Sequence, residues 1–238
     1  MQFNYLNGKF LYKNESNIST EDRGFNFADG VYEVIAFRKK TLLNYSKHIS
    51  RLECSLKSLK INSPLTNLNS LRFILKYLIN INFLNHGFLY LQITRGSCER
   101  NHLFSSELKS NIFISILPTK NLLKYKKFGV NVITSNDLRW KRCDIKSISL
   151  LPNVMGKQEA FNLNAYETWQ KNNKYITEGT TSNAFIVKDK KIFTHQKDNY
   201  ILGGVTRDVV IGIIKKKKKK LLKKNFQLKM HIMLMKLF

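Results

Sequence analysis

Residues that could bind a phosphate group stand at two places in this sequence. Gly203 and Gly204 allow a ligand to come close to the backbone, and Val205 and Thr206 open a predicted helix. The free N–H groups at the start of a helix suit a doubly charged anion. Arg51, on another predicted helix, could bind phosphate through two nitrogens. Taken alone, the glycine loop also fits an ordinary helix start, and Arg51 a solvated surface charge.

Four segments hold most of the residues that could do chemistry. They are residues 22–33 with 48–52, residues 92–102, residues 142–160, and residues 177–183 with 203–207. In this order they resemble the class IV (fold type IV) aminotransferases that use pyridoxal 5′-phosphate (PLP), and most of all the D-amino-acid aminotransferases. The resemblance covers about residues 1 to 214. Any one segment alone would be a weak signal, because short motifs recur by chance.

The resemblance implies that Lys146 forms the Schiff base with PLP and is the catalytic residue. Only an amine condenses reversibly with the cofactor aldehyde. Once released, the same amine can move a proton between the substrate carbon and the cofactor. That step needs a neutral lysine, which burial favours. By residue type alone, Lys146 is one of 32 lysines and would be assigned to the surface.

The resemblance also assigns residues that bind the cofactor. Glu178 matches the carboxylate beneath the pyridine nitrogen, which must stay protonated for the ring to act as an electron sink. Without the resemblance, Glu178 would be a solvated loop acid. The other residues expected at or near the cofactor are Arg51, Val205, Thr206, Thr181 and Ser182.

Three further residues indicate the substrate. In D-amino-acid aminotransferases, an Arg-x-His pair and a strand tyrosine hold the α-carboxylate, and Arg100, His102 and Tyr32 match them. Residues i and i+2 of an extended segment point to one side, so Arg100 and His102 can converge. The resemblance implies a homodimer that interconverts D-amino acids (D-alanine or D-glutamate type) and 2-oxo acids. Branched-chain aminotransferases and aminodeoxychorismate lyases share equivalents of Lys146 and Glu178, so both activities remain alternatives.

The elements that must position these residues follow from apolar periodicity and turn signals. Asn7-Gly8 and Lys39-Lys40 predict two hairpin turns, and Ser46 is the expected cap of a helix. In the first half, strands are predicted at 3–5, 10–12, 31–37, 41–44, 88–94 and 112–117, and helices at 46–59 and 66–78. In the second half, strands are predicted at 130–134, 184–187 and 191–194, and helices at 153–170 and 207–214.

This pattern predicts two α/β domains, and the resemblance implies the two-domain class IV fold, an α/β (α+β) architecture. The small N-terminal α/β domain is expected at residues 1–118, with a linker that begins at Pro118. The larger PLP-binding pseudobarrel domain is expected at residues 119–214 and is incomplete, because the family continues for several tens of residues more. Residues 215–238 form a lysine-rich tail.

The lysine-rich tail is expected to result from a shift of the reading frame. Lys215 to Lys220 imply a run of adenines, at which a frame can slip. Read one nucleotide earlier, the tail's codons permit Ile-Glu-Asp-Ala-Tyr-Asn-Ala-Asp-Glu-Val-Val, which resembles the family's continuation. We therefore hypothesise that residues after about Ile214 are a frameshift product. The alternatives are a solvated basic tail, or one that binds membrane or nucleic acid.

The net charge of +25 does not by itself indicate nucleic-acid binding. The tail holds ten lysines and no acid, which leaves +15 for residues 1–214 (31 basic against 16 acidic side chains). Lysine outnumbers arginine 32 to 9, whereas nucleic-acid readers favour arginine. No specific nucleic acid is therefore expected, and the resemblance implies small-molecule amino acid and 2-oxo acid substrates. A basic nucleic-acid-binding protein or an inactive remnant is the alternative of another class.

The remaining composition bears on cellular location. Cys54, Cys98 and Cys143 are widely spaced, which predicts neither a disulfide framework nor a metal site. No stretch of eighteen apolar residues occurs, and the first residues lack the pattern of a secretory signal. A cytoplasmic protein without a membrane partner is expected.

Overall fold

The computed structural model describes residues 2–65, 67–119 and 123–227 of the chain. The chain divides into two compact units, one of residues 1–120 with 145–149 and the other of residues 121–144 with 150–238. Among the described residues, the first unit has one sheet and one buried apolar cluster, and the second has two sheets and two such clusters. Both units mix helices with strands, as the sequence predicts. Among the described helices, none is long and apolar enough to cross a lipid bilayer.

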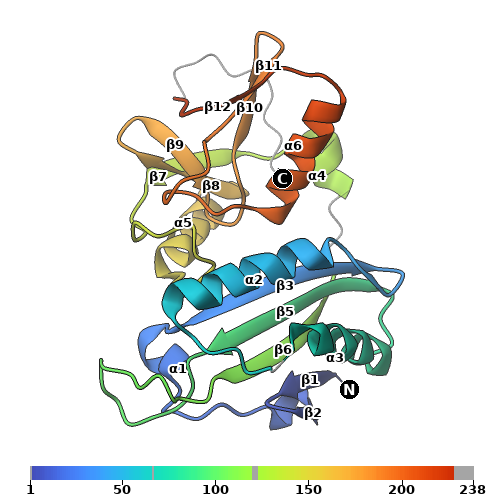
Figure 1. Ribbon diagram of the computed structural model, residues 1–238. Helices are drawn as coiled ribbons and strands as arrows, with labels where there is room; N and C mark the ends of the chain where they lie inside the picture. Colours follow the sequence, from blue (N-terminus) through green and yellow to red (C-terminus); the bar gives the residue numbers. More distant parts are fainter. Residues whose placement is uncertain (1, 66, 120–122, 228–238) are drawn as a thin grey trace. The chain divides into compact units, whose positions relative to one another are not determined.

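The first unit is built on a six-stranded antiparallel sheet with the order β2-β1-β6-β5-β3-β4 (Figure 1). The strands are β1 (Phe3–Leu6), β2 (Lys9–Tyr12), β3 (Gly30–Arg38), β4 (Thr41–Leu42), β5 (His86–Thr94) and β6 (Asn111–Pro118). Along β3, β5 and β6, buried side chains alternate with half-buried ones. This period of two turns one face of the sheet toward the core.

The two predicted hairpin turns are confirmed. Asn7 and Gly8 have φ values of 46° and 92°, and they join Leu6 to Lys9. Lys39 and Lys40 have φ values of 47° and 58° between β3 and β4. Two consecutive residues with positive φ match the right-handed twist of the flanking strands.

Helices α2 (Tyr45–Leu59) and α3 (Leu68–Ile81) pack on the inner face of this sheet (Figure 1). Their buried leucines, including Leu52 and Leu75, join the sheet residues in one cluster. The prediction of Ser46 as helix cap is wrong, because α2 already begins at Tyr45. The residue before it, Asn44, has a positive φ of 53° and makes no side-chain cap.

A short helix, α1 (Arg23–Phe27), precedes β3, and a turn of 3₁₀ helix, η1 (Lys13–Glu15), follows β2. Asp22 caps α1, because its Oδ1 accepts a hydrogen bond from the N–H of Gly24 at 2.7 Å. Its Oδ2 accepts from Thr94 and Asn111, each at 2.7 Å. The start of α1 is therefore fastened to the ends of β5 and β6.

Residues 145–149 belong to the first unit although they lie beyond the predicted boundary at residue 118. Ser147 forms an antiparallel bridge with Val31. The N–H of Tyr32 donates to the carbonyl of Lys146 at 3.0 Å, and the N–H of Ile148 donates to Gly30 at 3.0 Å. Through these bonds, residues 146–148 pair with the start of β3. A division drawn at one point of the chain could not include this returning segment.

The second unit contains two three-stranded sheets, β7-β8-β9 and β10-β11-β12. Their strands are β7 (Val132–Asn136), β8 (Glu167–Asn172), β9 (Tyr175–Gly179), β10 (Phe185–Lys188), β11 (Lys191–Thr194) and β12 (Leu221–Lys223). The helices are α4 (Leu123–Phe128), α5 (Leu151–Asn162) and α6 (Val205–Lys216). Trp169 is fully buried at the centre of this unit's main apolar cluster.

The predicted helix over 153–170 is wrong in its second half. Helix α5 ends at Asn162, Asn164 has a positive φ of 54°, and β8 begins at Glu167. Strand β8 is the middle strand of its sheet, and all of its first four side chains are buried. Thr168 and Trp169 are residue types that favour strands, and this packing decides their conformation over the helical pattern before them.

Part of the lysine-rich tail is integrated into the second unit. Helix α6 continues to Lys216, and β12 pairs in parallel with β11. Phe226 is 1% exposed and packs edge to face with Trp169, their ring centroids 6.1 Å apart. Residues 228–238 lie outside the described part of the chain, so the frameshift hypothesis stays a prediction.

Candidate functional site

The predicted site residues are divided between the two units. The first unit contains Tyr32, Arg51, Arg100, His102 and Lys146, and the second contains Glu178, Thr181, Ser182, Val205 and Thr206. The two sets are therefore described separately.

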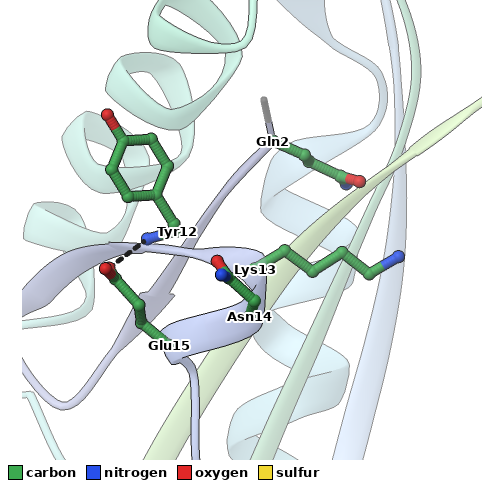
Figure 2. Close-up of a pocket in the computed structure, with 5 residues that line it drawn as sticks. All are labelled: Gln2, Tyr12, Lys13, Asn14 and Glu15. Atoms are coloured by element: carbon green, nitrogen blue, oxygen red, sulfur yellow. Dashed lines mark hydrogen bonds between the residues drawn. The ribbon is translucent and has the colours of Figure 1, made fainter.

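A surface pocket of the first unit is separate from these residues. It has a volume of about 690 Å³ and is lined by Gln2, Tyr12, Lys13, Asn14 and Glu15 (Figure 2). The carboxylate of Glu15 accepts a hydrogen bond from the N–H of Tyr12 at 3.2 Å, which closes the turn after β2. This hydrogen bond stabilises the turn, and no predicted site residue lines the pocket.

Lys146 is held in place by two hydrogen bonds of its backbone. Its carbonyl accepts a hydrogen bond from Tyr32 of β3, and its N–H donates to the hydroxyl of Ser55 at 3.2 Å. Ser55 lies on α2 and is buried, so strand and helix fix the lysine backbone from two directions. The Nζ atom lies 4.0 Å from the centroid of the Tyr32 ring. The structure thus brings two predicted site residues, Lys146 and Tyr32, into contact.

Arg51 lies on α2 and faces a carboxylate buried in the sheet. Its Nε and Nη2 donate to the two carboxylate oxygens of Glu33 at 2.7 and 2.8 Å. Nδ1 of His48, one helical turn before Arg51, lies 2.7 Å from Glu33 Oε2. Burial alone would raise the pKa of Glu33, but the hydrogen bonds from Arg51 and His48 hold that pKa below its usual value.

Glu33 and His48 were not predicted as site residues, although the sequence contains a signal for them. Glu33 stands between Val31 and Ile35 on the buried face of an alternating strand. A charge at such a position needs a paired partner. His48 and Arg51 are three residues apart on α2 and can meet it from one face of the helix.

Arg100 and His102 lie in the segment between β5 and β6. Both are exposed, and both lie beside Phe27 of α1. The Arg100 guanidinium is 5.0 Å from the centroid of the Phe27 ring, and the His102 ring is 5.3 Å from it. Tyr32 contacts Tyr90 at 5.8 Å between ring centroids. Arg100 and His102 are thus brought together around Phe27, and Tyr32 meets Lys146 and Tyr90.

Glu178, near the end of β9, is buried and surrounded by hydrogen-bond donors. Arg139 Nη1 and the N–H of Leu202 donate to Oε1, and Nδ2 of Asn183 donates to Oε2 at 2.7 Å. Burial raises the pKa of Glu178 to about 7 against the opposing pull of Arg139. The carboxyl group is therefore poised to change charge near neutral pH.

Arg139 and Asp137 complete this cluster, and the sequence analysis did not identify them. Arg139 donates through Nε and Nη2 to the two carboxylate oxygens of Asp137 at 2.9 and 2.7 Å. Thr177 donates to the same carboxylate at 2.8 Å. Burial opposes ionisation here too, yet the bonds from Arg139 and Thr177 hold the pKa of Asp137 below its usual value. One arginine thus serves two buried acids.

Thr181 and Ser182 gather around a third buried acid, Glu167, at the start of β8. The hydroxyl of Thr181 donates to Glu167 Oε2 at 2.8 Å, and that of Ser182 donates to it at 3.1 Å. Thr180 donates to Oε1. Glu167 therefore holds the chain from 180 to 182 in place, and the sequence analysis did not identify it.

The glycine loop leads into α6 as predicted. Gly204 is the residue before the helix, and a Cβ atom there would clash with Oδ1 of Asn183. Asn183 also donates to the carbonyl of Leu202 at 2.9 Å, so it joins this loop to Glu178. Val205 is buried and Thr206 is exposed. The N–H groups of these first helical residues have no preceding helical carbonyl to which they could donate.

Donor groups for an anion are therefore concentrated at this helix start. Arg207, in the first turn of α6, is 3% exposed, and Nη2 donates to the carbonyl of His195 at 2.7 Å. Its Nε is buried and has no hydrogen-bond partner among the described residues. In the described part of the chain, no group of three or more His, Cys, Asp or Glu residues could hold a metal ion.

Comparison with known proteins identifies the family. A family model described as amino-transferase class IV matches residues 30–231. The D-alanine aminotransferase of Bacillus licheniformis is 38% identical over 208 residues, which are 87% of this chain and 73% of the relative. The chain belongs to the class IV aminotransferase family. The D-alanine aminotransferase of Listeria innocua is 36% identical over 214 residues, 89% of this chain and 74% of that protein.

Solved structures show that the class IV fold is shared. The Escherichia coli branched-chain amino acid aminotransferase has a TM-score of 0.87 at 19% identity, over 96% of this chain and 79% of that one. A putative 4-amino-4-deoxychorismate lyase from Legionella pneumophila has a TM-score of 0.85 at 21% identity, over 94% of this chain and 84% of that one. The predicted family and fold class are confirmed, and the domain limits and the roles of single residues remain predictions.

The residues present fit the cofactor of class IV aminotransferases. The N-terminus of α6, where Gly204 has no Cβ, suits a phosphate dianion, and Arg207 in the same helical turn has a buried Nε with no hydrogen-bond partner among the described residues. Glu178 is a buried carboxyl group that can accept a hydrogen bond or a proton from a ring nitrogen. Lys146 supplies an amine on a fixed backbone.

Proposed function

We propose that this chain is a PLP-dependent aminotransferase that interconverts D-amino acids, of the D-alanine or D-glutamate type, and 2-oxo acids. The observation that carries the proposal is the 36–38% identity to D-alanine aminotransferases of Bacillus, Staphylococcus and Listeria over most of the chain. The site residues within each unit support it.

Lys146 is proposed to hold PLP covalently and to be the catalytic residue. When bound, PLP supplies an aldehyde that condenses with amines and a ring that accepts electrons from the substrate's Cα–H bond. Once the substrate amine has displaced it, Lys146 Nζ would move the α-proton between the substrate carbon and the cofactor, in one direction or the other. The bonds from Tyr32 and to Ser55 keep the backbone of this amine in one place.

Glu178 is proposed to pair with the ring nitrogen of the cofactor and to hold a proton between the two atoms. That role needs an ionised carboxyl group, and Arg139 favours the ionised form. The phosphate is assigned to Arg51 and to the backbone of Val205 and Thr206, with Thr181 and Ser182 nearby. Glu33 and His48 support this assignment because they fix the direction of the Arg51 side chain.

Tyr32, Arg100 and His102 are proposed to bind the α-carboxylate of the substrate. The contact of Arg100 and His102 with one ring, Phe27, supports a joint role, because it keeps the two side chains close together. The proposal includes a homodimer in the cytoplasm, with small amino and oxo acids as its partners. It includes neither a nucleic acid nor a membrane.

The test is turnover by the purified protein of D-alanine with 2-oxoglutarate, followed through the pyruvate formed. We expect activity in the wild type and in Lys141→Ala, which removes an exposed nearby lysine, and none in Lys146→Ala. Borohydride reduction followed by mass mapping is expected to find the pyridoxyl group on Lys146. L-Leucine and aminodeoxychorismate are the alternative substrates, and preference for either would contradict the D-amino-acid assignment.

A further inference from the structure

The segment between β5 and β6 that carries Arg100 and His102 contains no helix and no ladder strand. Its described residues are turns and bends, apart from one bridge between Ser97 and Asp22. A segment of this kind keeps its shape only through bonds to other elements. The contacts that fix residues 100–102 therefore decide where the side chains of Arg100 and His102 lie.

Arg23 of α1 supplies these contacts to the backbone. It is 4% exposed, and Nη1 donates to the carbonyls of Asn101 and Leu103 at 2.6 and 3.3 Å. Nη2 donates to the carbonyl of His102 at 3.4 Å. One charged group thus binds three consecutive carbonyls, and such charge-assisted bonds are stronger than neutral ones.

The same helix contacts the side chains of the segment. Phe27, one turn after Arg23, lies beside both Arg100 and His102. The Arg23 guanidinium is itself 4.8 Å from the centroid of the Phe27 ring. Helix α1 therefore fixes the backbone through Arg23 and restricts the side chains through Phe27.

Asp29 orients Arg23 and also binds a second arginine, Arg95, with which Arg23 can be compared. Its Oδ2 accepts from Arg23 Nε at 2.9 Å and from Arg95 Nε at 2.7 Å. Arg95 is 5% exposed and bonds the carbonyls of Leu59 and Lys60, at the end of α2, at 2.8 and 2.7 Å. The two arginines share one acid and similar burial, but their bonds to backbone carbonyls hold different segments.

We propose that Arg23 is a positioning residue for recognition of the substrate α-carboxylate: it fixes Arg100 and His102 by binding the backbone between them and beyond. The inference rests on the proposed function, because that function assigns the carboxylate to these residues. Arg23 acts through the segment and has no bond to the substrate in this proposal. Its loss is therefore expected to weaken substrate binding more than the chemical step.

The test compares Arg23→Gln with Arg95→Gln, because each removes one arginine from Asp29. We expect Arg23→Gln to raise the KM for D-alanine and for 2-oxoglutarate about tenfold or more, with kcat lowered less than about threefold and PLP content unchanged. Arg95→Gln is expected to leave both KM values within about twofold. Arg23→Lys keeps the charge but reaches fewer carbonyls, and its KM is expected to lie between those of the wild type and Arg23→Gln.

Hydrogen–deuterium exchange provides a readout that needs no turnover. Exchange over residues 97–109 is expected to rise in Arg23→Gln, and in Arg95→Gln to rise chiefly around residues 57–62. The Arg95 guanidinium also lies 3.6 Å from the centroid of the Phe104 ring, so a small rise at 104 fits the proposal.

The outcomes separate the two proposals. If the wild type does not turn over D-amino acids, the proposed function fails, and the assignment of Arg23 to substrate recognition fails with it. If the wild type is active but the KM of Arg23→Gln is unchanged, or both glutamine variants raise KM equally, only the role of Arg23 is overturned. A flat exchange profile over 97–109 in Arg23→Gln overturns that role as well.

Discussion

Glu33 in the first unit and Glu178 in the second are both buried carboxyl groups that face an arginine, yet their pKa values move in opposite directions. The Glu33 side chain is 0% exposed, and its pKa is lowered despite burial, because Arg51 and His48 donate to it. The Glu178 side chain is 6% exposed, and burial raises its pKa to about 7 against the pull of Arg139. Burial alone does not account for the difference.

The difference follows from how each arginine is shared. Arg51 gives two of its nitrogens to Glu33, and His48 adds a third donor. Arg139 gives two nitrogens to Asp137 and only one to Glu178. The pKa of Asp137 is accordingly lowered by Arg139, while that of Glu178 stays raised by burial. A cation between two buried acids stabilises one of them in preference to the other.

The largest effect is expected from breaking the Glu33 cluster. Glu33→Gln leaves the half-buried Arg51 and the buried His48 without their anionic partner, and such a loss lowers the free energy of unfolding by about 3–5 kcal/mol. Urea unfolding at pH 7 measures it. Glu53→Gln, an exposed substitution on α2, is the control and is expected to change little. A loss below about 1 kcal/mol for Glu33→Gln would show that the cluster contributes little to stability.

The second effect is the pH dependence of stability in the cofactor-free chain. Glu178 has a folded-state pKa of about 7 and a reference value of 4.5, so the folded chain binds its proton more tightly. Stability from this group is therefore highest below pH 4.5 and falls by about 3 kcal/mol as the pH rises to 7. Glu178→Gln is expected to remove this slope, measured by urea unfolding between pH 5 and 8.

Glu33 contributes with the opposite sign. Its pKa is lowered in the folded state, so its contribution is present above the unfolded value and is lost as the pH falls through the folded value. Glu33→Gln should therefore weaken the acid dependence and leave the slope between pH 5 and 8 unchanged. If both glutamine variants changed the same pH range, the comparison between the two clusters would be wrong.

A third, smaller effect is expected from Arg139→Lys. Lysine cannot bond both Asp137 and Glu178 with the fork of an arginine, so the pKa of Glu178 should rise further. The free energy of unfolding should fall by about 2 kcal/mol, since charged hydrogen bonds are lost. Arg142→Lys is the matched control, because Arg142 forms the same kind of pair with Asp144 at an exposed position. An equal loss in both variants would contradict a special role for Arg139.

More of the cluster around Glu33 than of the cluster around Glu178 could be predicted from the sequence. Strand 31–37 and helix 46–59 were both predicted, and Glu33 breaks the apolar alternation of that strand. Asp137 and Arg139 lie beyond β7 in a stretch without periodicity, about 40 residues from Glu178 in sequence. The groups meet only in the folded chain, where β9 places Glu178 beside Arg139. The same limit explains β8, because a central strand is defined by its neighbours and not by the helical pattern that precedes it.

The smallest effect is expected from Asp137→Asn, and it tests the sharing of Arg139 directly. The amide keeps the shape of Asp137 and removes its charge, so Arg139 is left with Glu178 as its anionic partner. The pKa of Glu178 should then fall, and the stability slope between pH 5 and 8 should become shallower. Net stability at pH 8 should change by about 1 kcal/mol or less, because the lost pair with Asp137 is offset by a stronger pair with Glu178. A steeper slope in Asp137→Asn would show that the two acids do not compete for this arginine.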